Sequence, residues 1–346
     1  MTASPMRDLT ARLYTAWRNA VLDEKIINPF QASKDGSHWV KGDRIVYGIR
    51  CIDNETAYYA QNLTQSQEIK GGTERKRLGD TGYICQFNSY RALRPGASNR
   101  PVGRQPEISA APEDCRFHCQ DATHPISLLQ RQPLLTAHLE YSPWHAYYNV
   151  APLDKDGHFL WVPTDAHTSL LPHAPQTLSF ETLVDAVQLF TQLTQTILFF
   201  NTLHAGASVN HIHLQALYHR YPLPIESAAV IDYRGYQLLD NYPVQAIVFS
   251  IQTPIQEIFA CVDRLQQERI PFNLIMVNDR ILVVVRNGDH EIVSEFPGDG
   301  FAALGMGGVI TTVDRHAYDT ITVAMIESTF AKMVIPAKQI VDRWLT

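Results

Sequence analysis

Three polar side chains stand at alternate positions in one short segment, His211, His213 and Gln215. Side chains alternate between the two faces of a β-strand, so a strand here would place all three on one face. Ile212 and Leu214 would then point to the opposite face, into a core. A neutral imidazole is a good nucleophile near pH 7, because its unperturbed pKa is about 6.5. The pattern therefore predicts a nucleophilic histidine held against a phosphate.

Attack by an imidazole on an α-phosphorus splits one difficult displacement into two easier ones. Phosphoryl transfer depends mostly on the positioning of the reacting groups and on hydrogen-bond donors that stabilise the negative charge developing on the phosphate oxygens. Ser208 and the backbone around Gly206 and Ala207 can supply such donors. The alternative interpretation is an ordinary strand with two hydrogen-bonded histidines, in which Ser208 is a turn residue and Asn201 a helix-terminal one.

The run from Asn201 to Gln215 contains Gly-Ala-Ser followed by His-φ-His-φ-Gln, where φ is apolar. It resembles the nucleotidyltransferase branch of the histidine-triad superfamily. That branch includes diadenosine tetraphosphate phosphorylases (ATP adenylyltransferases), GDP-hexose phosphorylases and, more distantly, galactose-1-phosphate uridylyltransferase. The resemblance implies that His213 is the nucleophile, that His211 orients the site, and that Gln215 holds a phosphate oxygen while the nucleotidyl-enzyme forms.

The third position of the motif separates two branches of the superfamily by resemblance. It is His in the hydrolases and Gln in the transferases, so Gln215 favours transfer or phosphorolysis. A neutral amide donates to a phosphoryl oxygen but supplies no titratable proton, which favours an anionic phosphate acceptor over water. Asn210 differs from the Pro of the uridylyltransferase and tetraphosphate phosphorylase versions and matches the GDP-hexose phosphorylase version. The phosphate- or nucleotide-binding residues implied by the resemblance are Asn201, Gly206, Ala207, Ser208 and Asn210.

A second cluster could bind a metal, and it consists of Cys115, His118, Cys119 and His124. Some superfamily members carry a structural zinc held by two Cys and two His, with the cysteines spaced C-x-x-C. Three residues separate the cysteines here, a spacing that zinc sites also allow. The alternative is a pair of buried or free thiols. The chemistry itself requires no cofactor, although Mg²⁺ could accompany the substrate phosphates.

Composition excludes several classes of protein. A net charge of -6 over 346 residues argues against broad affinity for nucleic acid, which needs basic patches. The sequence contains no apolar run of about 18 residues and begins without the apolar stretch of a secretory signal. The five scattered cysteines fit a reducing compartment better than a disulfide framework. We therefore expect a cytoplasmic protein with no nucleic-acid and no membrane partner.

Apolar periodicity predicts the elements that must position the motif. Ser179 is a helix N-cap, and an apolar stripe from Leu183 to Ile197 predicts a long helix with Gly206 as its natural end. In the first section the other expected elements are a helix over 6–25, strands over 39–52, a hairpin over 146–163 with Gly-His before an apolar run, and the motif strand up to about Tyr218.

Prolines at 222 and 224 end the motif strand, and a second section follows. It should contain a strand over 244–251, a helix over 255–267, a hairpin over 272–286, a glycine-interrupted strand from Leu304 and helices over 320–334 and 337–344. This section resembles the C-terminal part of diadenosine tetraphosphate phosphorylases. We therefore expect a histidine-triad-like nucleotidyltransferase domain over 1–225 and an α+β section over 226–346 that packs on it.

The expected fold is α+β, with antiparallel sheets flanked by helices and with room for two related halves around one site. The leading hypothesis is nucleotidyl transfer through a covalent nucleotidyl-histidine, by phosphorolysis of a dinucleoside polyphosphate or an NDP-hexose. The partners would be a nucleoside polyphosphate or nucleotide sugar with inorganic phosphate or a sugar phosphate, bound by a monomer or homodimer. The alternatives are a hydrolase of the same superfamily and a non-catalytic nucleotide- or metal-binding protein.

Overall fold

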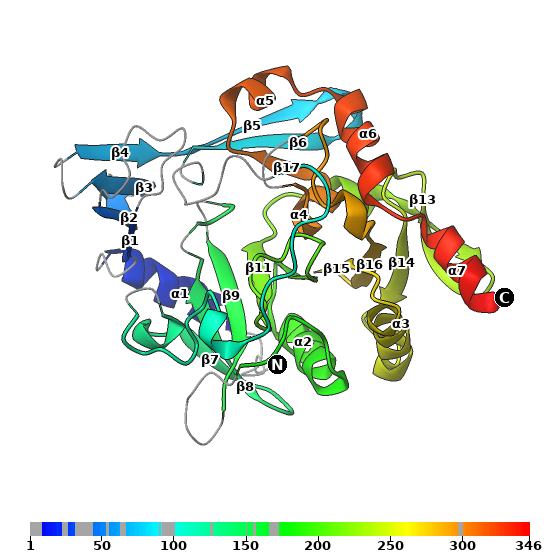
Figure 1. Ribbon diagram of the computed structural model, residues 1–346, viewed down its shortest axis with the longest axis horizontal. Coiled ribbons are helices and arrows are strands. Elements are labelled where there is room, and N and C mark those ends of the chain that lie inside the picture. Colours follow the sequence, from blue (N-terminus) through cyan, green and yellow to red (C-terminus); the bar gives the residue numbers. More distant parts are fainter. Residues whose placement is uncertain are drawn as a thin grey trace, which may run out of the picture.

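The computed structural model describes residues 9–22, 27–31, 44–52, 55–62, 67–89, 91, 101–124, 127–149, 151–154, 157–165, 173–296 and 300–346. Ten strands form its largest sheet, in the order β12-β13-β14-β16-β15-β10-β11-β9-β8-β7 (Figure 1). Every neighbouring pair in this sheet is antiparallel. In chain order its strands are β7 (Leu135–His138), β8 (Pro143–Tyr148), β9 (His158–Pro163), β10 (Thr196–Asn201), β11 (Leu214–Tyr218), β12 (Ala229–Tyr233), β13 (Tyr236–Asp240), β14 (Ala246–Ser250), β15 (Phe272–Val277) and β16 (Arg280–Val285).

Two smaller sheets and seven helices complete the described part of the chain. One sheet contains β1 (Ile27–Gln31), β2 (Arg44–Ile52), β3 (Glu55–Asn62) and β4 (Gln67–Gly71). The other joins β5 (Thr73–Leu78) and β6 (Tyr83–Asn88) to the distant β17 (Val309–Thr312), which runs parallel to β6. The helices are α1 (Leu9–Leu22), α2 (Phe180–Gln192), α3 (Ile255–Gln267), α4 (Ala303–Met306), α5 (Arg315–Thr320), α6 (Val323–Met333) and α7 (Ala337–Leu345).

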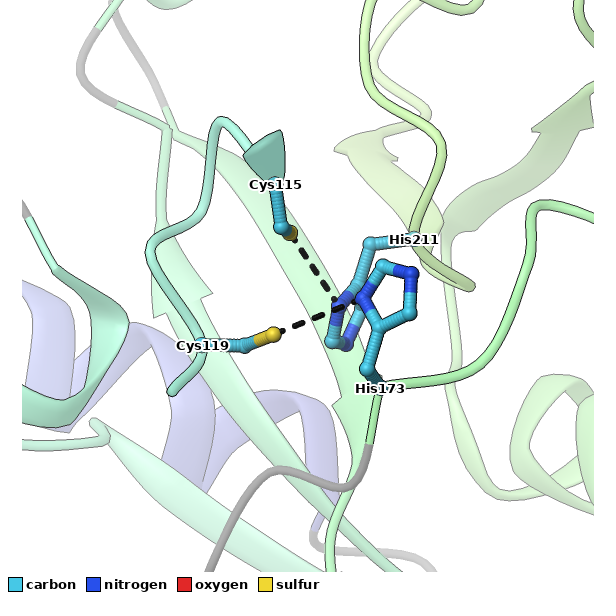
Figure 2. A group of neighbouring side chains, drawn as sticks. All are labelled: Cys115, Cys119, His173 and His211. Atoms are coloured by element: carbon cyan, nitrogen blue, oxygen red, sulfur yellow. Dashed lines mark hydrogen bonds between the residues drawn. The ribbon is translucent and has the colours of Figure 1, made fainter. Parts of the chain in front are cut away.

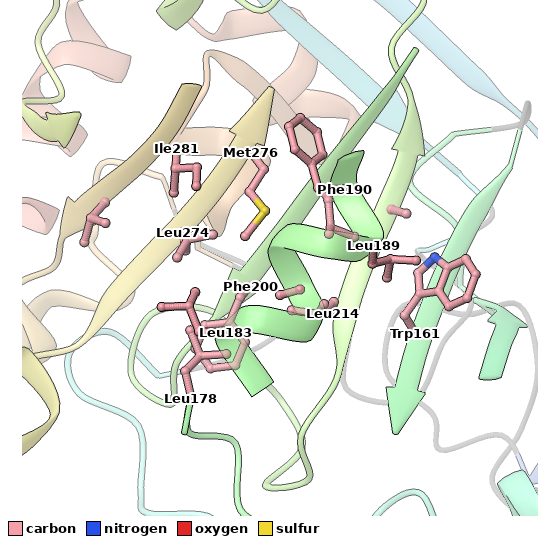
Figure 3. Close-up of a cluster of buried hydrophobic side chains, with 14 of the residues drawn as sticks. Trp161, Leu178, Leu183, Leu189, Phe190, Phe200, Leu214, Leu274, Met276 and Ile281 are labelled. Carbon is pink, nitrogen blue, oxygen red and sulfur yellow. The ribbon is translucent and has the colours of Figure 1, made fainter. Parts of the chain in front are cut away.

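The large sheet is buried on both faces. Helices α1, α2, α3 and α7 contribute to one apolar cluster, in which Leu183 and Leu189 of α2 pack with Phe200 of β10 (Figure 3). On the other face β6, β17 and helices α4 to α6 cover the sheet, where Phe199 joins a second cluster. Consecutive residues of β10 thus enter different cores, which follows from the alternation of side chains along a strand. Among the described residues, no helix combines the length and apolar character needed to cross a bilayer.

The long helix predicted from Ser179 to Gly206 is wrong in its second half. Ser179 does cap α2, but α2 ends at Gln192, and Thr196–Asn201 form β10. The apolar stripe of α2 continues into β10 without an intervening proline or glycine. Strand β10 is buried on both faces and shows no polar alternation that would mark it as a strand. Gly206 does not end a helix either. It lies in the loop after β10 with φ of 101°, a conformation that favours glycine.

Most other elements agree with the sequence. The hairpins β8–β9 and β15–β16, helix α3 and the antiparallel α+β architecture are confirmed. The strand expected from Leu304 is a short helix, α4, followed by β17. The proposed division at 225/226 separates β7–β11 from β12–β16, yet β10 pairs directly with β15. The two sections therefore share one continuous sheet.

Replacing Gly206 by alanine should destabilise the protein more than the same change at Gly235. Both residues have positive φ, but a Cβ at Gly206 would lie 2.6 Å from Cβ of Ala302, whereas one at Gly235 would meet nothing within 4 Å. The backbone strain alone should cost about 1 kcal/mol at either site, and the clash about 1–3 kcal/mol more at Gly206. Urea unfolding of the two variants measures the difference. Equal losses would show that the loop relaxes freely around the added methyl.

Candidate active site

The geometry of His213 is that of an unprotonated nucleophile. Its side chain is buried, and Nδ1 lies 2.8 Å from the carbonyl oxygen of His211. A carbonyl oxygen only accepts, so Nδ1 must carry the proton, and the neutral ring keeps its free lone pair on Nε2. Burial lowers the pKa of His213 to about 4, so the ring is neutral at physiological pH. The ring is therefore fixed in one tautomer, with an unprotonated Nε2.

The motif departs from a single strand in one respect. Strand β11 begins only at Leu214, so His211 and His213 lie in the bend that leads into it. The apolar half of the prediction is confirmed, since Ile212 and Leu214 are buried in the main core. Both imidazoles nevertheless contact the ring of Phe117, whose centroid lies 5.5 Å from that of His211 and 5.2 Å from that of His213.

His158 fixes the amide of Gln215, and sequence reasoning missed this role. The backbone N–H of Leu153 donates to Nδ1 of His158 at 3.0 Å, so the ring proton of neutral His158 must be on Nε2. That Nε2 donates to Oε1 of Gln215 at 2.9 Å. Burial, with a smaller effect of the Arg91 charge, lowers the pKa of His158 to about 3 and keeps the ring neutral. The amide nitrogen of Gln215 is thereby left as the donor that faces away from His158. The only sequence signal was the Gly-His pair that opens β9.

The predicted phosphate-binding residues gather in the loop after β10 and in the bend before β11, but several of them bond within the protein. The N–H of Gly206 donates to Glu291 at 3.0 Å, and that of Ala207 to the carbonyl of Thr202 at 3.2 Å. The Oδ1 of Asn201 accepts from the N–H of Ala303 at 3.0 Å. Their contact with phosphate stays a prediction.

The second section supports this loop through a buried guanidinium. Arg286 is fully buried, and its Nη1 donates to Oδ1 of Asn273 and to the carbonyl of Phe301, both at 2.7 Å. Asn273 in turn donates to Oδ1 of Asn201 at 2.8 Å and to the carbonyl of Ala205 at 2.7 Å. Burial lowers the pKa of Arg286 to about 10, which leaves it charged at neutral pH. The loop after β10 is thus anchored to β15 and β16.

A cavity of about 380 Å³ adjoins this loop. Arg116 lies at its edge and donates to the carbonyl of Ser208 at 3.3 Å. Three carboxylates contribute to the wall, those of Glu107, Asp114 and Glu291. The remaining lining residues include His204, Ala207, Ser208 and Ser109.

A group of metal-ligand type lies beside the motif and consists of Cys115, Cys119, His173 and His211 (Figure 2). Their four ligand atoms all lie within 4.8 Å of one another. The Sγ atom of Cys115 is 3.5 Å from Nδ1 of His211, and that of Cys119 is 3.5 Å from Nδ1 of His173. Two thiols and two imidazoles at this spacing form the donor set that tetrahedral zinc prefers.

This set replaces two of the four ligands expected from the sequence. His118 and His124 stack on each other with 3.4 Å between ring centroids and lie outside the group, and His173 and His211 are present instead. The ligand set expected from the sequence used histidines close to the cysteines in the chain. In the fold, the two histidines of the group come from segments that are distant from the cysteines in sequence. His211 therefore meets the cysteines through its ring and His213 through its carbonyl.

The chain is similar to known proteins over part of its length. Residues 233–340 match the family model described as GDPGP1-like, C-terminal domain. The chain is 31% identical over 222 residues to GDP-L-galactose phosphorylase 1 of Arabidopsis thaliana, covering 57% of this chain and 48% of that protein. It is 28% identical over 212 residues to GDP-D-glucose phosphorylase 1 of Homo sapiens, covering 57% and 53%. The chain thus spans about half the length of these curated relatives.

Solved structures show the same fold. Yeast Ap4A phosphorylase Apa2 in complex with AMP superposes with a TM-score of 0.52 at 14% identity, covering 77% of this chain and 89% of that one. The family model and the curated relatives confirm the resemblance to the phosphorylase branch of the histidine-triad superfamily, and the solved structure shows the same fold. Within that branch the chain is similar in sequence to GDP-hexose phosphorylases.

The buried neutral state of His158 predicts a loss of stability in acid. Its pKa is about 3 in the folded protein against about 6.5 when unfolded, so the unfolded state gains a proton first as pH falls. The stabilisation is complete above about pH 6.5 and is lost progressively toward pH 3, about 2 kcal/mol of it between pH 7 and pH 5. Urea unfolding at both pH values should show this drop reduced by that amount in His158→Phe. The same change at the exposed His316 should leave the drop as in the wild type.

Proposed function

We propose that this protein transfers a nucleoside monophosphate through His213, by phosphorolysis of an NDP-hexose. The observation that carries the proposal is the hydrogen bond from Nδ1 of His213 to the carbonyl of His211 at 2.8 Å, which leaves Nε2 unprotonated. Nε2 would bond to the α-phosphorus while the bond from phosphorus to the bridging oxygen breaks and hexose 1-phosphate departs. Inorganic phosphate would then attack the same phosphorus, return the electron pair to Nε2 and leave as part of the NDP.

The surroundings of Gln215 support transfer rather than hydrolysis. His158 holds the amide oxygen, so the amide nitrogen is the group directed away to meet a phosphate oxygen. An amide offers a hydrogen bond but cannot take a proton from water as a general base. An acceptor that is already anionic needs no such base, which favours phosphate as the acceptor.

The cavity beside Ser208 supports a sugar-containing substrate over a dinucleoside polyphosphate. The cavity is lined by three carboxylates and one guanidinium, so its excess of negative charge would repel the further phosphates of a dinucleoside polyphosphate. Carboxylates instead accept hydrogen bonds from the hydroxyl groups of a sugar. The curated relatives named above are GDP-hexose phosphorylases, and their similarity covers 57% of this chain. The likeness to Ap4A phosphorylase concerns the fold.

We also propose a structural zinc at Cys115, Cys119, His173 and His211. The metal would fix the turn between the two cysteines, whose Phe117 ring lies 5.2 Å from the ring of His213. It would also hold the ring of His211, whose carbonyl accepts the proton of the nucleophile. The zinc would therefore support the geometry of the site without entering the reaction, and Mg²⁺ on the substrate phosphates remains an expectation.

The proposal predicts a covalent adduct. Protein freed of phosphate and mixed with a panel of NDP-hexoses labelled at the α-phosphate should become labelled through an acid-labile bond, because no acceptor discharges the intermediate. His213→Ala should take up no label, and His316→Ala on the exposed surface should label as the wild type does. Added phosphate should release labelled NDP. Release of labelled NMP at the same rate without phosphate would identify a hydrolase instead, and an unlabelled wild type would refute the proposal.

The ligand set predicts about one zinc per chain in protein purified without chelators, measured by plasma mass spectrometry. Cys119→Ser and His173→Ala should lose the metal, since each removes one of four ligands. His124→Ala is the matched control, because this histidine is close in sequence yet outside the group. Zinc retained in His173→Ala but lost in His124→Ala would contradict the proposed ligands and would support the set expected from the sequence alone.

A further inference from the structure

The ladder between β10 and β11 stops just before the nucleophile. Its register runs from Thr196 opposite Tyr218 to Phe199 opposite Gln215. Continued by two residues on each strand, the same register would place Asn201 opposite His213. The two residues do not pair, since the ladder ends at Phe199 opposite Gln215 and β11 begins only at Leu214.

The side chain of Gln176 occupies the gap between the separated chains. Its Oε1 accepts from the N–H of His213 at 2.9 Å, while its Nε2 donates to the carbonyl of Asn201 at 2.9 Å and to that of His213 at 3.2 Å. The side chain is 2% exposed, so water does not compete for these groups. A carboxamide has the same donors and acceptor as a peptide group. Gln176 therefore substitutes for the missing rung of the ladder.

The segment that carries Gln176 is itself fixed to the motif. The N–H of Gln176 donates to Oδ1 of Asn210 at 2.9 Å, and the N–H of Ile212 donates to the carbonyl of Ala174 at 2.9 Å. Hydrogen bonds thus hold the side chain of Asn210 before His211 and the backbone of Ile212 after it. The bond from Nδ1 of His213 to the His211 carbonyl lies within this anchored stretch.

We propose that Gln176 is a positioning residue for the nucleophile, which fixes the backbone of His213 and thereby the aim of Nε2. The inference rests on the proposed function, since it concerns the rate at which His213 takes up the nucleotide. Removal of the amide leaves a buried N–H and two carbonyl groups without this partner. The backbone of His213 then shifts to recover hydrogen bonds, and the ring loses its direction.

The chain offers a matched control for this test. Gln266 holds both backbone groups of Leu178 with its own amide, accepting from the N–H at 2.8 Å and donating to the carbonyl at 2.9 Å. Leu178 lies two residues along the same segment, but it does not contact the motif through this amide. Gln176→Met and Gln266→Met therefore remove the same kind of clamp, and only the first touches the nucleophile.

The experiment measures single-turnover labelling of each variant by an α-labelled NDP-hexose without phosphate, together with the equilibrium affinity for the nucleotide. Gln176→Met should label about 10–100-fold more slowly, with nucleotide affinity changed less than about threefold, because positioning affects the transition state more than binding. Gln266→Met should label within about twofold of the wild type. Equal rates in the two variants, whether both normal or both slow, would reduce Gln176 to a structural residue and overturn the inference.

A second variant covers the case in which Gln176→Met does not fold. Gln176→Glu keeps the size and the acceptor but loses both donors when ionised, and burial raises the pKa of the introduced carboxyl. Labelling should be slow at pH 8 and should recover partly at pH 6, where protonation restores one donor. The wild type and Gln266→Glu should show no such gain, and a shared gain would refute the inference. An unlabelled wild type would instead refute the proposed function, and this inference with it.

Discussion

One hydrogen bond determines what the site can do, from Nδ1 of His213 to the carbonyl of His211. It selects the tautomer, and burial keeps the ring neutral, so the attack that we propose for His213 would need no separate general base. The same logic recurs at His158, where a backbone N–H selects the opposite tautomer and so orients Gln215. Backbone groups thus set the protonation of both rings, and the precision of the site depends on a rigid main chain.

That rigidity is obtained from both sections of the chain. Strand β10 lies at the centre of the large sheet, between β11 of the first section and β15 of the second. The loop that leaves β10 is tied back to β15 and β16 by Asn273 and the buried Arg286. A buried charge costs free energy unless its donors are used. Arg286 donates through Nε to the carbonyl of Met333 and through Nη1 to Asn273 and Phe301, whereas its Nη2 has no partner among the described residues. The second section therefore shapes the site without contributing a motif to it.

The sequence predicted what depends on local pattern and missed what depends on distant contacts. Alternation identified His213 and Gln215, and apolar runs with turn residues gave the hairpins β8–β9 and β15–β16. Periodicity could not separate helix α2 from strand β10, since apolar residues recur through both and neither proline nor glycine stands between them. The metal-ligand type group shares only Cys115 and Cys119 with the set expected from the sequence, because His173 and His211 join the cysteines only through the fold. Gln176 and Arg286 carry no sequence signal, as a buried amide or guanidinium looks like any surface residue until its partners are known.

The continuous sheet has a consequence for how this chain can be divided. A fragment that ended at residue 225 would leave β10 with an unpaired edge, and both of its faces are apolar. Such an edge is a template for intermolecular pairing. We therefore expect the fragment that ends at residue 225 to aggregate. The region that matches the C-terminal family model accordingly contains β15, while its partner strand β10 lies outside the matched residues. Any duplication, fusion or circular permutation of this fold must therefore keep β10 and β15 in one chain, so that the two strands can pair.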